Sequence, residues 1–439
     1  MKRPWREGIV VTALLLTAGC RGAQTDGPAS APVRGPDELG DQRLIERAAA
    51  IHRNAIVIDG HNDVATWIVD FDFDLGMDGW EPEDRSGLLY LVAPGLPWKP
   101  RPAGLRTDSD LGRFERGGVD AQFFSVWASE DYYDPEDPTS GRSFARANEI
   151  IDALTEQARR HDDRMEIALS SDDIRRIASQ GKLAMLFGVE GGHAIEHDLG
   201  KLRQLHGRGV RYMTLTHSFS HSWADSSGDP LQDAQVLHGG LTGFGREVVA
   251  EMNALGMLVD ISHVSDATFW NALEVSRAPV IASHSSVRSL ASHPRNLSDE
   301  MLRAVAQNGG VVMINFSIMY LDERKTTPWR MTRNWLGHFG GSETSVVHVA
   351  DHIAHVVNVA GIDHVGIGSD FDGTPFLPRG LSHVGELPNL TTELLRRGYS
   401  EAAIRKILGG NLLRVLESAE RVARNEPELP DATPDSGPT

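Results

Sequence analysis

His61 and Asp63, whose side chains both bind divalent metals, lie two residues apart directly after a short apolar run. In an extended strand alternate side chains point to the same face, so both groups can reach one ion beyond the strand's end. The triplet His-x-Asp also arises by chance, and a strand that leaves the core through a polar turn has the same sequence. The pattern gains weight because three further apolar runs end in Glu190, His263 and His284. A metal site at the end of a sheet requires this convergence from several strands.

The residue types available restrict which metal centre can form. The chain has 18 histidines and a single cysteine, Cys20, so an internal disulfide is impossible and any metal is bound by nitrogen and oxygen. Its 439 residues carry a net charge of −18, which argues against nucleic acid or an anionic lipid surface as a partner, since both attract basic patches. With 40% apolar residues the chain can bury a large core without disulfides.

Eight short β-rich runs alternate with amphipathic helical patterns and must position these side chains. The runs are Ala55–Asp59, Val119–Trp127, Leu183–Val189, Tyr212–Thr216, Met257–Ile261, Pro279–Ser283, Gly310–Phe316 and His364–Gly368. The helical patterns are Ala145–Arg160, Gly243–Leu255, Asp266–Ser276, Ser298–Gln307 with Ser298 as N-cap, Thr344–Val359 and Glu401–Ser418. Eight strands alternating with helices predict an α/β fold, a (β/α)8 TIM-like barrel, whose strands are buried on both faces and lack polar alternation.

In a barrel of this kind the active site gathers at the C-terminal ends of the strands. Polar residues follow six of the eight predicted strands there: His61 and Asp63, Glu190, His217, His263, His284 and Asp370. An open, doubly wound sheet is the alternative fold, but it would not easily bring the ends of the first, third, fifth and sixth strands to one point. The barrel is therefore the fold that we predict.

Other polar residues near these positions have more than one interpretation. Three carboxylates neighbour the candidate ligands and either orient the imidazoles or are solvated strand ends: Asp59, Asp260 and Asp372. Three histidines at helical spacing predict a polar helix face: His348, His352 and His355. Two more histidines lie beyond the glycine turn that follows Glu190 and are interpreted as loop residues: His193 and His197.

Two long insertions interrupt the barrel pattern on the side of the predicted site. Residues 64–118 follow the first strand, and residues 318–342 follow the seventh. Loops of this length are uncommon in compact domains unless they have a function. We expect both to wall or cover a pocket, with a merely decorative role as the alternative.

The chain begins with the layout of an export signal. Three basic residues within the first six precede the apolar stretch 9–16, which is too short to span a membrane. The segment Leu16–Cys20 that follows resembles a bacterial lipobox, in which the cysteine is lipidated. This pattern predicts a lipoprotein held in the bacterial cell envelope by a lipid on Cys20. A plain secretory signal with an incidental cysteine is the alternative.

Composition divides the chain into four parts. The export pattern predicts a signal peptide at residues 1–19, and the Gly- and Pro-rich stretch 20–40 predicts a flexible tether. The strand and helix patterns predict one folded domain at 41–424. The stretch 425–439 has the composition of a disordered tail.

Seven motifs spread over the predicted domain resemble the renal (membrane) dipeptidase family. They are His61-Asn62-Asp63, Gly188-Val189-Glu190-Gly191, Thr214-Leu215-Thr216-His217, Ile261-Ser262-His263-Val264-Ser265, Ser283-His284-Ser285, His293-Pro294-Arg295-Asn296 and Gly366-Ile367-Gly368-Ser369-Asp370-Phe371-Asp372-Gly373. The match follows the family's order over nearly the whole domain. The resemblance implies a metal-dependent barrel of the amidohydrolase type, a pair of zinc ions and hydrolysis of dipeptides.

The resemblance also implies a role for each matched residue. The implied ligands are His61 and Asp63 on one zinc, His263 and His284 on the other, and Glu190 as the bridge. The implied substrate-side residues are His217 and Arg295 around the bound dipeptide, Tyr320 lining the pocket and Asp370 as the proton carrier. Animal members of the family carry disulfides and a glycolipid anchor, whereas this chain has a lipobox and no second cysteine. The insertion 318–342 falls where the pocket wall is expected.

The implied centre has a consistent chemistry. Two zinc ions that share a carboxylate lie about 3.5–4 Å apart and can turn a water held between them into hydroxide at neutral pH. His217 would then stabilise the oxyanion, and Asp370 would move the proton from the water to the leaving amine. Arg295 would pair with the C-terminal carboxylate of a free dipeptide, with a loop-fixing role for this arginine as the alternative.

Two other functions fit part of this pattern. A binuclear hydrolase of other amides or of lactones would use the same metal pair. A lipoprotein that binds peptides or metal without turnover would be expected to lack the bridge or the proton carrier, yet Glu190 and Asp370 are both present. These two residues therefore favour an enzyme, and the resemblance, with Arg295 as a partner for a substrate carboxylate, favours a zinc-dependent dipeptidase. The sequence leaves open whether the C-terminal residue of the substrate is L or D, and whether the protein is a monomer or a homodimer.

Overall fold

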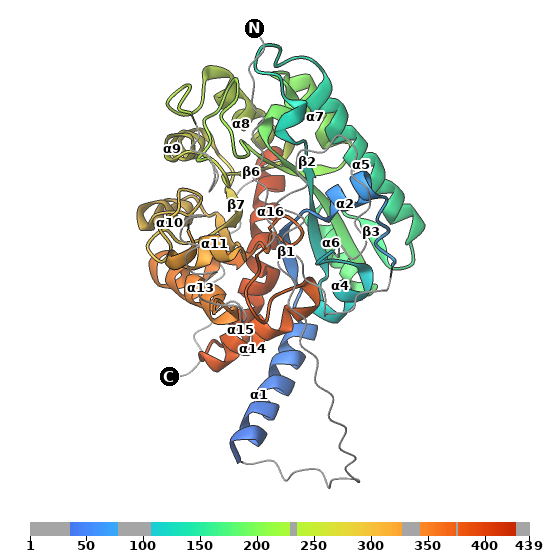
Figure 1. Ribbon diagram of the computed structural model, residues 1–439, viewed down its shortest axis with the longest axis vertical. Coiled ribbons are helices and arrows are strands. Elements are labelled where there is room, and N and C mark those ends of the chain that lie inside the picture. The colour runs from blue at the N-terminus through green and yellow to red at the C-terminus, as the bar shows by residue number, and fades with distance from the viewer. Residues whose placement is uncertain (1–35, 78–106, 229–234, 327–342, 375, 427–439) are drawn as a thin grey trace, which may run out of the picture. The chain divides into compact units, whose positions relative to one another are not determined.

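The computed structural model describes residues 36–77, 107–228, 235–326, 343–374 and 376–426 (Figure 1). The chain forms two compact units, residues 1–42 and 43–439. The described part of the first unit is the beginning of helix α1 (Pro36–Arg53), which starts inside the stretch predicted as a tether. The predicted signal peptide with Cys20, much of both insertions and almost all of the predicted tail lie outside the described residues.

Within the described residues, nine parallel strands form the sheet of the second unit, and eight of them close into a barrel. The strands are β1 (Ile58–Asn62), β2 (Ala121–Trp127), β3 (Met165–Ile167), β4 (Leu183–Glu190), β5 (Val210–Thr214), β6 (Leu258–Asp260), β7 (Ile281–Ser285), β8 (Val311–Ile314) and β9 (Val365–Ile367). Neighbouring strands follow the order β2-β1-β9-β8-β7-β6-β5-β4, and β2 pairs with β4 along its whole length. This last pairing closes the ring, which confirms the predicted (β/α)8 barrel.

The short strand β3 was not predicted. It pairs with the first three residues of β4, while β5 pairs with β4 from Phe187 onward. Both therefore lie along the same edge of β4, and β3 extends the sheet without taking a place in the ring. Three residues are too few for a hydrophobic period to indicate a strand.

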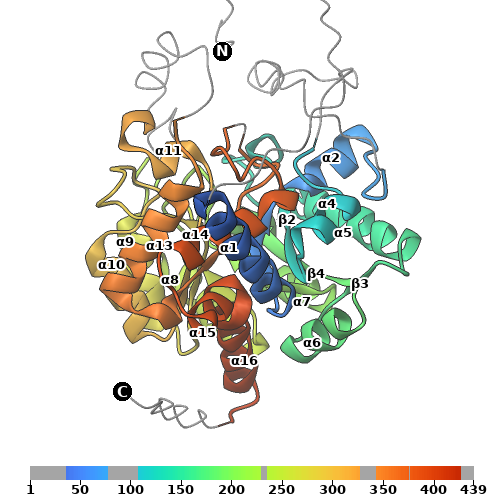
Figure 2. The same ribbon diagram turned by 90° about the horizontal axis from the view of Figure 1, so that it is seen from below.

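Helices connect the strands and lie around the barrel (Figure 2). The α-helices besides α1 are α2 (Val64–Phe71), α4 (Leu111–Gly117), α5 (Arg142–Arg160), α6 (Ser171–Ser179), α7 (Leu199–Gly207), α8 (Gly243–Leu255), α9 (Asp266–Val275), α10 (Asp299–Gln307), α11 (Ile318–Leu321), α13 (Val346–Ala360), α14 (Pro388–Arg396), α15 (Glu401–Arg405) and α16 (Asn411–Ala423). Short 3-10 turns are η1 (Glu130–Tyr132), η2 (Gly192–Ile195), η3 (Glu323–Lys325), η4 (Ile362–His364) and η5 (Val384–Glu386). No helix in the described parts of the chain has both the length and the hydropathy needed to cross a membrane.

The predicted helix ends lie within three residues of those in the structure except near the C-terminus. Helix α8 has the predicted bounds, and Ser298 accepts a hydrogen bond from the amide of Met301 at the start of α10, as expected of an N-cap. The predicted helix Glu401–Ser418 is instead interrupted by a π-helical turn, η6 (Lys406–Gly410). A Cβ atom on Gly409 would lie 2.3 Å from the carbonyl oxygen of Ile56, so only glycine allows this close packing against the chain before β1.

The barrel interior is filled at one end by helix α16. Its Leu412, Val415 and Leu416 share a buried cluster with the first residues of five strands, which are Ile58, Ala121, Leu258, Ile281 and Val311. Helix α16 therefore covers the N-terminal end of the barrel. The larger core lies between the outer face of the barrel and the surrounding helices. The opposite, C-terminal end is left for polar residues.

One predicted surface feature of helix α13 is wrong. His352, assigned to a polar helix face, is only 1% exposed. Its Nδ1 accepts a hydrogen bond from the amide of Val287 at 3.0 Å, and its Nε2 donates to the carbonyl oxygen of Leu321 at 3.1 Å. The histidine thus joins α13 to the segments after β7 and β8, a tertiary role that helical spacing cannot reveal.

Candidate metal centre

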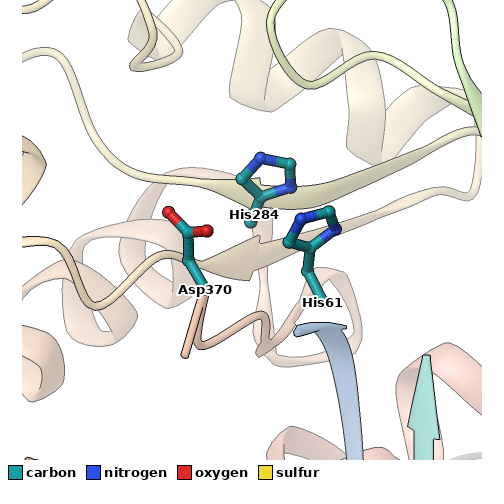
Figure 3. A group of neighbouring side chains, drawn as sticks. All are labelled: His61, His284 and Asp370. Carbon is teal, nitrogen blue, oxygen red and sulfur yellow. The ribbon is translucent and has the colours of Figure 1, made fainter. Parts of the chain in front are cut away.

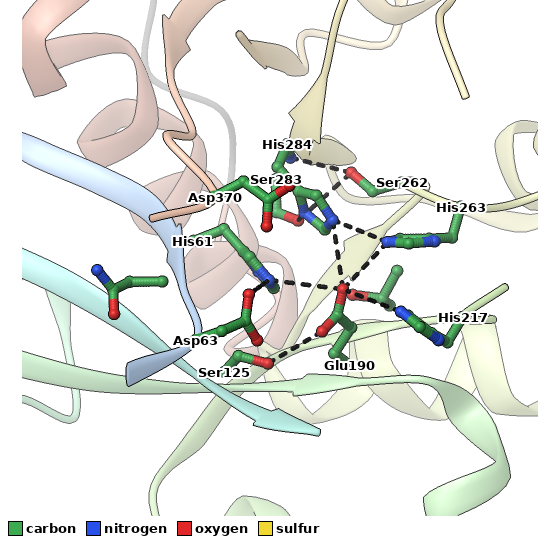
Figure 4. Close-up of polar contacts among 12 residues, drawn as sticks. His61, Asp63, Ser125, Glu190, His217, Ser262, His263, Ser283, His284 and Asp370 are labelled. Carbon is green, nitrogen blue, oxygen red and sulfur yellow. Dashed lines mark hydrogen bonds and ion pairs between the residues drawn. The ribbon is translucent and has the colours of Figure 1, made fainter. Parts of the chain in front are cut away.

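The seven predicted ligand and catalytic residues meet at the C-terminal end of the barrel (Figure 4). The strands β1, β4 and β7 carry His61, Glu190 and His284 at or next to their last residue, and Asp63 follows β1 directly. The other three each lie three residues beyond a strand: His217 after β5, His263 after β6 and Asp370 after β9. The five predicted metal ligands are all less than 9% exposed.

Two of these residues adopt a backbone conformation that is rare for side chains other than glycine. His263 has φ 65° and Asp370 has φ 63°, both in the left-handed region. Such conformations cost free energy and persist where the surrounding structure holds them, often at functional sites. Here each turn redirects a side chain from beyond the strand end back over the barrel axis, toward the other ligands.

The carboxylate of Glu190 is the centre of the cluster. Its Oε1 lies 3.0 Å from Nε2 of His263, 3.3 Å from Nε2 of His284 and 3.5 Å from Nε2 of His61. Asp63 Oδ2 lies 3.2 Å from the same His61 nitrogen. Asp370 joins His61 and His284 in a second group whose ligand atoms all lie within 4.8 Å of one another (Figure 3). Every predicted ligand is therefore within reach of a shared cation.

Hydrogen bonds fix which nitrogen of two imidazoles carries the proton. The hydroxyl of Ser283 donates to Asp260 at 2.6 Å, so it must accept from Nδ1–H of His284 at 2.7 Å. The hydroxyl of Tyr212 donates to the carbonyl oxygen of Gly60 at 3.2 Å and accepts from Nδ1–H of His61 at 2.7 Å. Both rings consequently turn an Nε2 lone pair toward Glu190, the geometry that a metal ligand requires.

Three Nε2 atoms crowd around one carboxylate oxygen of Glu190. The Nε2 atoms of His263 and His284 are 2.9 Å apart, and burial holds the pKa of both rings well below the usual value, so both rings are neutral and His284, with its proton on Nδ1, offers a lone pair on Nε2. Nε2 of His61 is buried and has no hydrogen-bond partner among the described residues. Nitrogen and carboxylate oxygen are the ligands that zinc and similar divalent ions prefer. The side chains present therefore fit a metal centre.

Two of the neighbouring carboxylates hold the strand ends and do not contact a ligand imidazole. Asp260 accepts hydrogen bonds from the amides of Ser262 and Ser283 at 3.0 and 2.8 Å. Asp59 accepts from the amide and the hydroxyl of Ser369 at 2.8 and 2.5 Å. Both aspartates are fully buried. They orient the ligands indirectly, by fixing the backbone from which the ligands project.

Asp370 is held by a residue that sequence analysis missed. Nδ2 of Asn315 donates to Oδ2 of Asp370 at 2.9 Å. Burial and the nearby charge of Asp63 raise the pKa of Asp370 to about 7. A carboxyl group with a pKa near neutrality is suited to accept a proton and release it again.

Arg295 contacts the backbone of His284, one of the residues of the same cluster. It is 3% exposed, and its Nη2 donates to the carbonyl oxygen of His284 at 3.1 Å. The ring of Tyr320 lies 5.4 Å from the centre of its guanidinium group. Among the described residues, no carboxylate lies within 4.0 Å of its nitrogens, although a buried guanidinium normally has one. The contact with a backbone carbonyl agrees with the loop-fixing alternative, and the missing counter-charge leaves room for a substrate carboxylate.

Sequence analysis missed other polar groups around the site. Ser125 in β2 donates to Oε2 of Glu190 at 3.1 Å, and Glu130, just after β2, lies 2.6 Å from Nδ1 of His217. Asn315 follows β8. The strands β2 and β8 correspond to the two predicted strands that had no assigned site residue. A search for any polar residue at those two strand ends would have found these groups.

A parallel (β/α)8 barrel with histidines and carboxylates converging at its C-terminal end is the arrangement of many metal-dependent hydrolases. Residues 45–429 match the sequence profile of the family described as membrane dipeptidase, peptidase family M19. The chain belongs to this family, which confirms the resemblance found in the sequence. Membership in a metallopeptidase family implies that the centre binds metal ions.

Known proteins similar to this chain are dipeptidases and metallopeptidases. Dipeptidase tcpJ of Claviceps purpurea (strain 20.1) is 39% identical over 331 residues, which cover 74% of this chain and 73% of that protein. The probable dipeptidase PvdM of Pseudomonas aeruginosa is 25% identical, with a TM-score of 0.71 over 87% of this chain and 100% of that chain. A metallo peptidase from Rhodobacter sphaeroides, liganded with a phosphinate mimic of the dipeptide L-Ala-D-Ala, is 25% identical, with a TM-score of 0.65 over 83% of this chain and 100% of that chain. This chain is a metallo-dipeptidase.

Proposed function

We propose that the protein hydrolyses free dipeptides with two zinc ions bound at this centre. The observation that carries the proposal is the convergence of three imidazole nitrogens on Oε1 of one buried carboxylate, Glu190. His61 and Asp63 would hold one ion, His263 and His284 the other, and Glu190 would bridge them. When bound, the ions would supply a hydroxide nucleophile at neutral pH and polarise the substrate carbonyl.

Two residues of the chain handle the charge and the proton. Burial lowers the pKa of His217, but the charges of Glu130 and Glu190 outweigh this and raise it above its usual value, which favours an imidazolium with a proton on both nitrogens. Nε2 of this ring faces the cluster, 3.9 Å from Oε1 of Glu190, where it can donate to the oxyanion that develops on the attacked carbonyl. Asp370 accepts the proton of the nucleophile and delivers it to the departing amine, which must be protonated to leave. Asn315 keeps one oxygen of this carboxylate fixed.

The substrate is proposed to be a dipeptide with a free C-terminal carboxylate and a D-residue at that position. The buried guanidinium of Arg295, without a carboxylate partner among the described residues, supports recognition of the carboxylate. Tyr320 beside it would line the same end of the pocket. The similar metallo peptidase from Rhodobacter sphaeroides is liganded with a mimic of L-Ala-D-Ala, which supports the D-configuration.

A dipeptide library with matched L- and D-configured second residues tests this proposal. We expect turnover of free dipeptides, higher kcat/KM for the D-configured member of each pair, and about two zinc equivalents per chain. Turnover of C-terminally amidated dipeptides or lactones at equal kcat/KM would favour the broader binuclear hydrolase. Binding without turnover of any member would favour the peptide-binding lipoprotein.

We also propose that the protein is exported and held in the bacterial cell envelope by a lipid on Cys20. The support is the basic, apolar and small-residue order of the first twenty residues. Fractionation of cells that produce the full chain tests this. The wild-type protein should sediment with membranes, and Cys20→Ser should release it or leave it unprocessed. Equal sedimentation of a processed Cys20→Ser protein would rule out the lipid.

A further inference from the structure

Glu130 lies behind the histidine that faces the reacting carbonyl. Its Oε1 is 2.6 Å from Nδ1 of His217 (the ring labelled in Figure 4), while Nε2 of the same ring points toward Glu190. A carboxylate only accepts hydrogen bonds, so Nδ1 of His217 is the donor of this contact. Within the described residues, no other group forms a hydrogen bond with Nδ1.

The segment that carries Glu130 is fixed by several independent contacts. Nε2 of the buried His193 donates to the carbonyl oxygen of Ala128 at 2.7 Å. The hydroxyl of Ser143, at the start of α5, donates to the carbonyl oxygen of Tyr132 at 2.9 Å. These contacts hold the turn η1 from both sides. The carboxylate of Glu130 is therefore presented to His217 from a rigid backbone.

The other contacts of the His217 ring do not fix its rotation. The ring lies 5.4 Å from that of Trp127 and 4.5 Å from that of His263, both tilted against it. Such ring contacts have broad angular preferences, whereas a short bond to a charged acceptor has a narrow one. The terminal torsion of histidine is soft, so loss of the Nδ1 contact would let Nε2 turn away from the carbonyl.

We propose that Glu130 is a positioning residue for the dipeptidase reaction: it holds the ring of His217 with Nε2 directed at the carbonyl under attack. This inference rests on the proposed oxyanion role of His217. Glu130 touches neither the ligands nor the reacting atoms, and its side chain is 40% exposed, so its truncation leaves no buried cavity. Its effect should therefore appear in transition-state stabilisation and not in metal binding or folding.

A double-mutant cycle between Glu130 and His217 tests the proposal. We expect His217→Ala to lower kcat about a hundredfold, the scale for one oxyanion donor. Glu130→Ala should lower kcat about tenfold with little change in KM, and should have no further effect when His217 is already alanine. Glu130→Gln keeps an oxygen acceptor for Nδ1–H and should stay within about threefold of wild type. Asp131→Ala removes an exposed carboxylate next in sequence and serves as the matched control with unchanged kcat.

A binding measurement separates positioning from general damage. Measured by calorimetry, Glu130→Ala should weaken the binding of a phosphinate dipeptide mimic about tenfold, because the tetrahedral anion of the mimic resembles the transition state. The variant's metal content and its affinity for a slowly cleaved dipeptide should match those of the wild type. Loss of metal, or equal weakening of the binding of the phosphinate mimic and of the dipeptide, would overturn the inference.

The outcomes also separate this inference from the proposed function. If His217→Ala lowers kcat but Glu130→Ala does not, or if the two losses multiply in the double variant, Glu130 does not position His217 and the proposed role of His217 stands. If His217→Ala leaves kcat unchanged, the oxyanion role is wrong and the inference fails with it. A Glu130→Gln variant as impaired as Glu130→Ala would also overturn positioning through an acceptor.

Discussion

Two groups of buried histidines lie at the C-terminal end of the barrel, and they have opposite chemistry. The ligand group, His61, His263 and His284, turns Nε2 toward the carboxylate of Glu190. The loop group, His193 and His221, directs Nε2 at backbone carbonyl oxygens, those of Ala128 at 2.7 Å and Leu215 at 2.9 Å. Both groups are almost completely buried.

The partners, and not the histidines themselves, decide what each group can do. Nε2 of a loop-group ring carries a proton and donates it to a carbonyl, so it has no lone pair to offer a metal. Burial lowers the pKa of His193 to about 4 and that of His221 to about 3, with aromatic rings of Tyr133 and Phe219 nearby. The loop group therefore stabilises the segments after β2, β4 and β5, while the ligand group is left able to bind cations.

Glu190→Gln should have the largest effect on this contrast, because the carboxylate is the shared partner of the whole ligand group. We expect the variant to lose most of both metal equivalents and all measurable activity, since the bridge serves both ions. His284→Ala should mainly weaken the binding of one ion. Metal analysis of the two purified variants is the measurement, and equal metal losses in Glu190→Gln and His284→Ala would count against a bridging role of Glu190.

A matched variant from the loop group sharpens the same comparison. His193→Gln keeps an N–H donor near the carbonyl of Ala128 and should retain two metal equivalents. Removal of metal by a chelator should abolish activity in this variant and in the wild type alike. If His193→Gln lost metal as fully as Glu190→Gln, the distinction between the two groups would not hold.

Asp370→Asn should lower kcat about 10²-fold or more while metal and substrate binding remain, which is the usual scale of acid–base assistance. Single-turnover kinetics and metal analysis check both parts. Asp370 also lies within reach of His61 and His284, so a loss of metal in this variant would instead identify it as a ligand.

Arg295→Ala should cost about ten- to a hundredfold in kcat/KM for a free dipeptide, corresponding to roughly 1.5–3 kcal/mol for one charge-assisted contact. The C-terminal amide of the same dipeptide should be a poor substrate for the wild type and lose little more in the variant. An amide cleaved by the wild type as well as the acid would mean that Arg295 only fixes the backbone at His284.

Substitution of His221 should give the smallest effect, and this effect should be confined to stability. Its pKa is near 3 in the fold and about 6.5 in the unfolded chain, so folding excludes a proton that the unfolded chain binds below pH 6.5. Because of this residue, the free energy of unfolding should fall by about 2 kcal/mol from pH 7 to pH 5. Urea unfolding at both pH values should show this loss of stability in the wild type and a smaller loss in His221→Gln. Equal losses would mean that His221 is protonated in the fold.

The ligand group could be predicted from sequence because each member lies at a barrel strand end or no more than three residues beyond it. The same rule placed Asp370 correctly, even though its left-handed backbone could not be foreseen. His193 was correctly interpreted as a loop residue, but the burial and the hydrogen bonds of the loop group could not be predicted, because loop segments show no periodicity. Tyr212 was hidden for another reason: within an apolar run it looks like any core aromatic residue, and its partner His61 lies on a distant strand.

Closure of the barrel joins the two ends of the folded chain. β1, which carries His61, pairs with β2 on one side and with β9 on the other, through Asp59 and Ile367. Helix α16 follows β9 and fills the opposite end of the ring. A ribosome makes His61 and β2 early, whereas β9 and α16 come near the C-terminal end of the domain. We therefore expect a nascent chain that lacks β9 and α16 to be unable to close the barrel and to hydrolyse peptides.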